Sequence, residues 1–137
     1  MRIEQYSELP PEAKALREEV FVKEQGFTLE FDETDGKATH FVGFSGEVPA
    51  ATCRVYRDEV LGFVAGRIAV RKAFRGKGLG AEILRAAEGY VRERGGGEVV
   101  ISAQLRAEPF YEKQGYVREG NAYRDESCPH VRMRKKL

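Results

Sequence analysis

The chain has 137 residues, enough for one domain with a buried core and too few for two ordinary domains. Hydrophobic residues make up 42% and charged residues 33%, a balance typical of a globular protein with a charged surface. The formal net charge of +1 argues against a dedicated nucleic-acid-binding protein, because such proteins usually carry a marked basic excess. The first residues contain no long apolar run, so we expect no signal peptide and no membrane span, and we predict a cytoplasmic protein.

Residues 1–6 predict a short strand that ends at a turn containing two prolines. Residues 11–25 follow as an amphipathic helix, since their apolar side chains recur with helical spacing. Residues 28–38 are acidic and rich in turn formers, so we expect a surface loop or a single turn there. Three strands joined by tight turns are then predicted at residues 39–44, 50–57 and 63–70.

The second half begins with a predicted helix over residues 78–94, which the triple glycine 95–97 ends. A continuous apolar run over residues 98–104 predicts a buried strand. A short helix over 107–114 and strands at 116–117 and 130–135 complete the chain. With no repeat and no linker, this order predicts a single α+β domain over residues 1–137.

Three glycines and two cations stand between the strand at 63–70 and the helix that follows it. The segment consists of Arg75, Gly76, Lys77, Gly78, Leu79 and Gly80. Glycines let the backbone approach a bulky anion, and the start of a helix offers unpaired N–H groups and a positive dipole end. The pattern therefore favours a phosphate site, and a glycine-rich turn without a ligand is the alternative.

Two other phosphate-binding motifs do not fit this segment. A Walker loop requires a Lys-Ser or Lys-Thr ending, which is absent here. Gly76, Gly78 and Ala81 have the spacing of a dinucleotide-binding fingerprint, but five residues separate Val70 from the first glycine. The acidic residue about twenty positions on, Glu98, begins its strand, whereas the ribose-binding acid of that fold follows a strand's end.

Two separate motifs resemble the GCN5-related N-acetyltransferase (GNAT) superfamily. Arg75, Gly78 and Gly80 match its R/Q-x-x-G-x-G/A loop between a strand and a helix. The family pattern N-x-x-A-x-x-x-Y-x-K-x-G-F/Y is matched by Gln104, Ala107, Tyr111, Lys113, Gly115 and Tyr116, with glutamine in the asparagine position. The stretches 20–27, 30–40 and 125–133 further resemble the small bacterial branch related to ElaA.

The resemblance implies an α/β/α sandwich with a mixed, mostly antiparallel sheet that splays open as a V between its central strands. It implies acetyl-CoA as co-substrate, whose pyrophosphate would lie on the backbone amides of the glycine loop, residues 75–80. Main-chain groups of Ile68, Ala69 and Val70 would pair with the pantetheine arm, and Gln104 would contact it. Arg71 and Lys72 could reach the 3′-phosphate, or they are solvated surface cations.

The family position of the general acid falls on Tyr111, whose phenol would protonate the departing thiolate; the alternative is a core aromatic residue. A backbone N–H near Val70 would stabilise the oxyanion. The general base stays open among Glu24, Glu30, Asp32, Glu33, Asp35 and His130. Cys128 could relay the acyl group, but direct transfer is preferred. Cys53, Cys128, His40 and His130 do not form a metal-binding pattern, so we expect no metal.

We therefore predict an acetyl-CoA-dependent N-acetyltransferase that acts on a primary amine by direct attack in a ternary complex. The acceptor would be a small-molecule or protein amine, and the acidic segment suggests a cationic one. We expect no nucleic-acid or membrane partner, and the resemblance allows a homodimer. The alternative is a non-catalytic acyl-CoA-binding regulatory module with the same fold.

Overall fold

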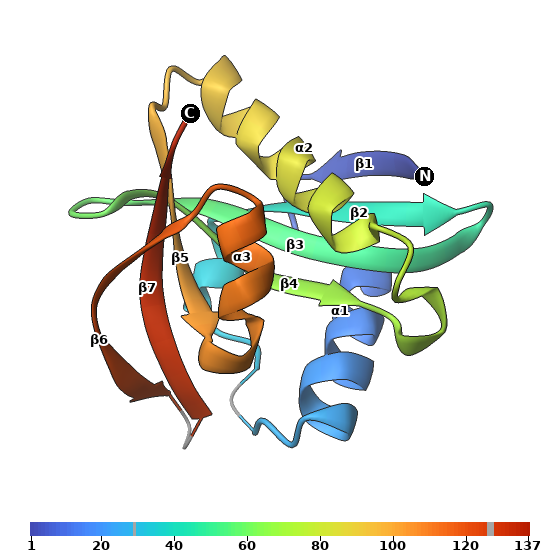
Figure 1. The fold of residues 1–137 in the computed structure, drawn as a ribbon. Helices are drawn as coiled ribbons and strands as arrows, with labels where there is room; N and C mark the ends of the chain where they lie inside the picture. Colours follow the sequence, from blue (N-terminus) through green and yellow to red (C-terminus); the bar gives the residue numbers. More distant parts are fainter. Residues whose placement is uncertain (29, 126–127) are drawn as a thin grey trace.

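A seven-stranded sheet in the order β1-β2-β3-β4-β5-β7-β6 organises the chain in the computed structural model, which describes residues 1–28, 30–125 and 128–137 (Figure 1). Its strands are β1 (Arg2–Tyr6), β2 (Thr39–Ser45), β3 (Val48–Asp58), β4 (Gly62–Val70), β5 (Glu98–Gln104), β6 (Val117–Asp125) and β7 (Cys128–Lys136). All neighbouring strands are antiparallel except β4 and β5, which are parallel. The predicted strands are confirmed except the one at residues 116–117, which shares only Val117 with the much longer β6.

Three α-helices and four π- or 3-10-helical segments connect the strands in the described parts of the chain. The α-helices are α1 (Pro11–Arg17), α2 (Leu79–Glu93) and α3 (Glu108–Lys113), and the other segments are η1 (Glu18–Glu24), η2 (Glu33–Gly36), η3 (Lys72–Phe74) and η4 (Leu105–Ala107). The helices over 78–94 and 107–114 are confirmed to within two residues at each end.

The predicted helix over residues 11–25 is right in extent but wrong in geometry beyond Arg17. The chain widens there into the π-helical segment η1, and Gln25 N–H donates to the carbonyl of Val20, five residues earlier, at 3.1 Å. In an α-helix, Phe21 would lie about 140° around the axis from Leu16, at about 100° per residue. The wider turn brings both side chains into one apolar cluster with Val20 and Ala69.

Helices cover both faces of the sheet (Figure 1). The side chains of β2 contribute to an apolar core on each face of the sheet, because successive residues of a strand point to opposite faces. Phe41 packs in the main core beneath α2, whereas Val42 and Phe44 pack with Ala13 of α1 on the other face. The predicted sandwich of helices around a mixed sheet is therefore confirmed.

The sheet splays open between β4 and β5. These two strands pair only at Val64 with Val100 and at Ala65 with Ile101. Beyond these pairs β5 runs away from β4 (Figure 1) and continues its pairing with β7 on the other side. The predicted V between the central strands is thus confirmed, and the edge of β4 beyond Ala65 faces the opening.

A β-bulge lies in β4 just past the last pair with β5. The register of β4 against β3 shifts between Thr52 and Arg54, opposite residues 66–69. Arg67 has a positive φ of 51° there, a conformation that costs energy in a residue with a side chain. The bulge bends β4 at the mouth of the opening, as bulges next to functional sites commonly do.

The acidic segment after η1 is held inside the protein by an arginine of α1. The side chain of Arg17 is only 1% exposed, although arginine is usually found at the surface. Its Nε donates to Glu30 Oε2 at 2.8 Å and its Nη1 to Asp35 Oδ1 at 2.8 Å. The prediction of an acidic surface loop is therefore wrong for Glu30 and Asp35, which are buried.

Two arginines of the sheet complete this arginine–carboxylate cluster. Arg54 of β3 donates through Nη1 to Asp32 Oδ1 at 2.7 Å and to Asp35 Oδ1 at 2.9 Å. Arg67 Nε lies 3.0 Å from Glu30 Oε2. The cluster thus contains three arginines, at positions 17, 54 and 67, and three carboxylates, at positions 30, 32 and 35. Because removing one partner leaves a buried charge uncompensated, we expect such a loss to cost about 3–5 kcal/mol.

We predict that Asp35 makes the unfolding free energy depend on pH in the acid range. Burial opposes ionisation of its carboxyl group, but hydrogen bonds and charge from Arg17 and Arg54 outweigh it and lower the pKa of Asp35 to about 2. Since the pKa is lowered on folding, its contribution is complete above the ordinary value near pH 4 and is lost as the pH falls towards 2. A shift of this size corresponds to about 2 kcal/mol.

Urea unfolding at pH 5, 4 and 3 should show that the stability advantage of the parent over an Asp35→Asn variant shrinks as the pH falls. Glu33→Gln is the matched control, because Glu33 lies in the same turn, η2, but is exposed. A difference between the parent and Asp35→Asn that stays constant over this range would contradict the prediction.

Candidate active site

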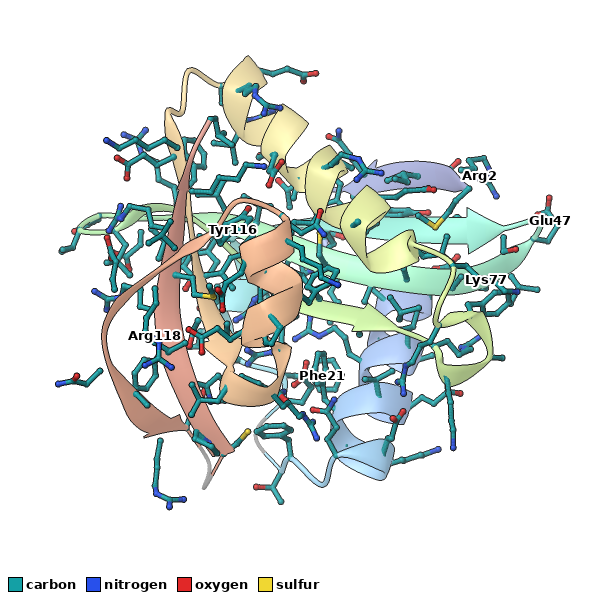
Figure 2. The ribbon with its side chains drawn as sticks, viewed as in Figure 1. Arg2, Phe21, Glu47, Lys77, Tyr116 and Arg118 are labelled. Carbon is teal, nitrogen blue, oxygen red and sulfur yellow. The ribbon has the colours of Figure 1, made fainter. Side chains whose placement is uncertain are left out.

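The glycine loop, residues 75–80, leaves its backbone open to a ligand. Gly76 and Gly78 have φ values of 79° and 78°, and a Cβ atom added to either would meet no atom within 4 Å. Glu82 N–H makes the helical bond to the carbonyl of Gly78, so the amides of the preceding turn have no acceptor within α2. Figure 2 labels Lys77 on this loop, where its side chain is exposed. The geometry fits an anion at the helix start.

Gly80 has a different role, because it sits where three elements meet. A Cβ atom there would lie 3.4 Å from the ring of Phe110 in α3 and 3.6 Å from Val70 at the end of β4. These are ordinary van der Waals distances, so the first turn of α2 packs against both elements and would also accept a methyl group here. The glycine loop is thereby fixed beside the end of β4.

Arg75 is bound within the protein rather than free at the loop. Its two terminal nitrogens donate to the carboxylate of Glu24 at 2.6 and 2.8 Å, and its Nε donates to the carbonyl of Val70 at 2.9 Å. The hydrogen bond from Arg75 lowers the pKa of Glu24. Of the two cations in the loop, Lys77 therefore projects into solvent and Arg75 ties the loop to η1.

The flanking cations that could reach a 3′-phosphate lie at the end of β4. Arg71 Nε donates to Glu19 Oε2 of η1 at 2.9 Å, and its backbone N–H donates to the carbonyl of Ala50 at 2.8 Å. Lys72 is exposed at the start of η3. The amide of Arg71 is therefore occupied, which leaves residues nearer Val70 as the possible oxyanion donors.

A cavity of about 220 Å³ lies in the opening between β4 and β5, and we call it the central cavity. It is lined by Phe21, Gln25, Phe27, Glu30, Gly66, Arg67, Ile68, Ile101, Ser102, Gln104, Arg106, Ala107, Tyr111, Asp125 and His130. Figure 2 shows Phe21 below α3, on the side of the first helical segment. The cavity thus joins the two arms of the V to segments from both ends of the chain.

The predicted pantetheine-binding residues of β4 alternate in direction. Ile68 lines the central cavity, Ala69 packs on the opposite face with Leu16 and Phe21, and Val70 packs against the main core. Their side chains therefore do not form a common surface. A ligand in the opening would instead meet the backbone edge of β4, which has no neighbouring strand beyond Ala65 among the described residues.

Tyr111 of α3 lines the central cavity and is 8% exposed. Its ring makes edge-to-face contacts with Phe110 and Tyr116, at centroid distances of 5.1 and 6.0 Å. Burial raises the pKa of Tyr111, so the phenol stays protonated near neutral pH. A buried phenol held in this way can donate a proton into the cavity.

Gln104, in the asparagine position of the family motif, spans the mouth of the cavity. Its Nε2 donates to Gln25 Oε1 at 3.0 Å, which links the end of β5 to the end of the first helical segment. Its Oε1 accepts from Arg106 Nε at 2.7 Å. A second cavity of about 350 Å³ adjoins this bridge and is also lined by Cys128.

The structure separates the acidic candidates for the general base. Asp35 is bound by Arg17 and Arg54, its pKa is lowered, and it does not line the central cavity, so its position argues against the hypothesis that it acts as a base. Glu24, Asp32 and Glu33 do not line the central cavity. Glu30 does line it, but its carboxylate is bound by Arg17 and Arg67, and its burial raises its pKa.

His130 also lines the central cavity and is 7% exposed, so the structure brings it together with Tyr111 and Gln104. Arg67 lines the same cavity and was missed by the sequence analysis, since nothing in the sequence around it signals the bulge. Among the described residues, no group of three or more His, Cys, Asp or Glu side chains could bind a metal ion. None of the helices in these parts of the chain has the length and hydropathy needed to cross a bilayer.

Comparisons with known proteins agree with this geometry. A family model described as Acetyltransferase (GNAT) domain matches residues 7–137. A Bacillus subtilis protein named "Uncharacterized N-acetyltransferase YjcF" is 37% identical over 123 residues, which cover 88% of this chain and 87% of the relative. The crystal structure of Escherichia coli ElaA has a TM-score of 0.83 at 26% identity, covering 98% of this chain and 99% of that one.

The crystal structure of an acyl-CoA N-acyltransferase from Pseudomonas aeruginosa is similar to the same degree. Its TM-score is 0.82 at 27% identity, and the alignment covers 98% of both chains. The resemblance inferred from the glycine loop and the Tyr111 motif is therefore confirmed over nearly the whole chain. The chain belongs to the GNAT family of N-acetyltransferases.

Proposed function

We propose that this protein transfers an acetyl group from acetyl-CoA to a primary amine by direct attack in a ternary complex. The observation that carries the proposal is the opening between β4 and β5, because it joins an anion-binding loop to a cavity that holds a protonated tyrosine. The acyl-CoA named for the similar Pseudomonas aeruginosa structure supports the donor class. The family description, which names acetyltransferases, supports acetyl as the acyl group.

The glycine loop would bind the pyrophosphate of the donor through backbone amides and the dipole of α2, with Lys77 adding positive charge. The free edge of β4 at residues 68–70 would hydrogen-bond the pantetheine arm as a neighbouring strand would. Gln104 would contact the arm from β5, where it already bridges to Gln25. These contacts would bring the thioester to the end of the opening, beside the central cavity.

A backbone amide near Val70 would stabilise the negative charge that develops on the thioester oxygen during attack. Tyr111 would donate its phenol proton to the departing thiolate. Cys128 is not needed as an acyl carrier, because the central cavity has room for the amine to attack directly. The acceptor would be a small molecule or an exposed amino group of a protein.

The argument for a cationic acceptor loses its physical basis. It depended on an acidic rim, yet Glu30, Asp32 and Asp35 are balanced by Arg17, Arg54 and Arg67. A charge-neutral cluster attracts cations only weakly. The proposal therefore keeps the amine and drops the requirement for further positive charge.

The alternative is a regulatory module that binds acyl-CoA without turnover. Release of free coenzyme A thiol from acetyl-CoA, measured with a panel of small amines and amine-containing peptides, separates the two. The enzyme should release thiol above the rate without acceptor for at least one amine. Stabilisation by acetyl-CoA without any acceptor-dependent thiol would favour the binding module.

We predict that a negative charge at Gly78 abolishes donor binding. Aspartate and asparagine both tolerate positive φ better than other residues, and the space around Gly78 is open. Gly78→Asp should therefore fold like Gly78→Asn, but it should repel the pyrophosphate. Acetyl-CoA at about 100 times its Kd should stabilise the parent by about 2.7 kcal/mol, seen as a rise in Tm.

That rise should persist in part in Gly78→Asn and vanish in Gly78→Asp. Equal Tm rises in the two variants would show that the pyrophosphate does not bind at this loop. A parent protein whose Tm does not respond to acetyl-CoA would count against the donor itself.

We predict that Tyr111→Phe lowers kcat for thiol release by about 100-fold or more, the usual range for loss of a general acid. The Tm rise with acetyl-CoA should be unchanged, because the ring and its edge-to-face contacts remain. Tyr116→Phe is the matched control: its hydroxyl donates to buried Glu88 at 2.8 Å and does not line the cavity. Similar turnover in Tyr111→Phe and Tyr116→Phe would make Tyr111 a packing residue.

A further inference from the structure

The ring of His130 is held in one tautomer. Its Nδ1 lies 2.9 Å from the backbone carbonyl of Cys128. Because a carbonyl oxygen only accepts hydrogen bonds, Nδ1 carries a proton, and in the neutral ring the lone pair is therefore on Nε2. His130 and Tyr111 both line the central cavity, so Nε2 of the neutral ring would be the basic nitrogen at this site.

The ring lies between the two strands that neighbour β7, and a side chain of β6 packs on it. Tyr123 of β6 stacks on it at a centroid distance of 6.1 Å and an interplanar angle of 22°. The Tyr123 hydroxyl in turn hydrogen-bonds the hydroxyl of Ser102 in β5. His130 itself lies in β7, directly opposite Gln104 of β5 in the sheet register. Such support is what a proton-transfer group needs to keep its geometry.

Glu30 and Asp125 are the carboxylates that line the cavity together with this imidazole. Glu30 is bound by arginines, and Asp125 is exposed at the end of β6. A water-exposed carboxylate is a weak base at neutral pH, whereas imidazole takes up and releases protons there. The titratable or charged groups that share the cavity with His130 are Glu30, Arg67, Arg106, Tyr111 and Asp125.

We propose that Nε2 of His130 is the general base that deprotonates the acceptor amine, an inference that rests on the proposed transferase activity. Nε2 takes one proton from the ammonium, and the freed nitrogen lone pair bonds to the thioester carbonyl carbon. The carbon–sulfur bond breaks, and the sulfur takes the phenol proton of Tyr111. The second nitrogen proton returns to Tyr111, and His130 releases its proton to solvent, so amide, thiol and one proton result.

His130→Asn tests this role, because the asparagine amide can still donate to the Cys128 carbonyl while the basic Nε2 is lost. Thiol release should fall by about 100-fold at pH 7. The variant must rely on acceptor molecules that are already neutral amines in solution. Below the pKa of the amine, the neutral fraction rises about tenfold for each unit by which the pH is raised. The deficit relative to the parent should therefore shrink towards pH 9–10, while the Tm rise with acetyl-CoA stays as in the parent.

His130→Gln serves as a second variant should the first fold poorly, and Cys128→Ser is the control. The control should turn over like the parent, since Cys128 reaches His130 through its backbone carbonyl. The role of His130 as general base would be overturned by a deficit in thiol release that is the same at every pH, or by no deficit. Loss of cooperative melting in both His130 variants would overturn it as well. Absence of thiol release by the parent with every amine would instead overturn the proposed function, and His130's role with it.

Discussion

The early end of the pairing between β4 and β5 is the constraint on which the site depends. A parallel pair that stops after two residue pairs leaves backbone N–H and C=O groups facing an opening inside a sheet. Unpaired backbone groups in a protein interior cost free energy unless water or a ligand satisfies them. The opening is therefore tolerable because a ligand with its own donors and acceptors can occupy it, and the pantetheine arm has such groups.

The walls of the opening must be held apart by something stiffer than apolar contact. On the β4 side, the arginine–carboxylate cluster ties α1 and the segment from Glu30 to Asp35 to β3 and β4. Because its three arginines balance three carboxylates, the cluster adds rigidity without a net field in the cavity. On the β5 side, α3 and β7 support Tyr111 and His130. The bulge at Arg67 belongs to the β4 side as well, since its side chain binds Glu30 while its backbone bends β4.

Sequence reasoning predicted the strands, the helices α2 and α3 and the glycine loop, because each follows from local signals. Glycines at positive φ, a Pro-containing helix start and alternating apolar residues act within a few positions of where they occur. The π-helical turn at η1, the burial of Glu30 and Asp35 and the positive φ of Arg67 depend on partners far along the chain. Arg17 is 18 residues from Asp35, and Arg54 is 19 residues from it. Because these partners are distant in the sequence, the segment itself shows only its charge, which is typical of solvated surface.

The same difference separates the proposed donor site, which local motifs indicate, from the proposed acceptor site, whose general base the sequence left open. A cofactor bound through backbone groups constrains residue types where the chain must bend or approach closely, which concentrates the signal in Gly76, Gly78 and Gly80. Acceptor chemistry uses side chains that separate elements bring together, here η1, β4, α3 and β7. The sequence placed Tyr111 in a motif and named His130 among six candidate bases, but only the structure shows the hydrogen bond and the stacked neighbour that favour His130.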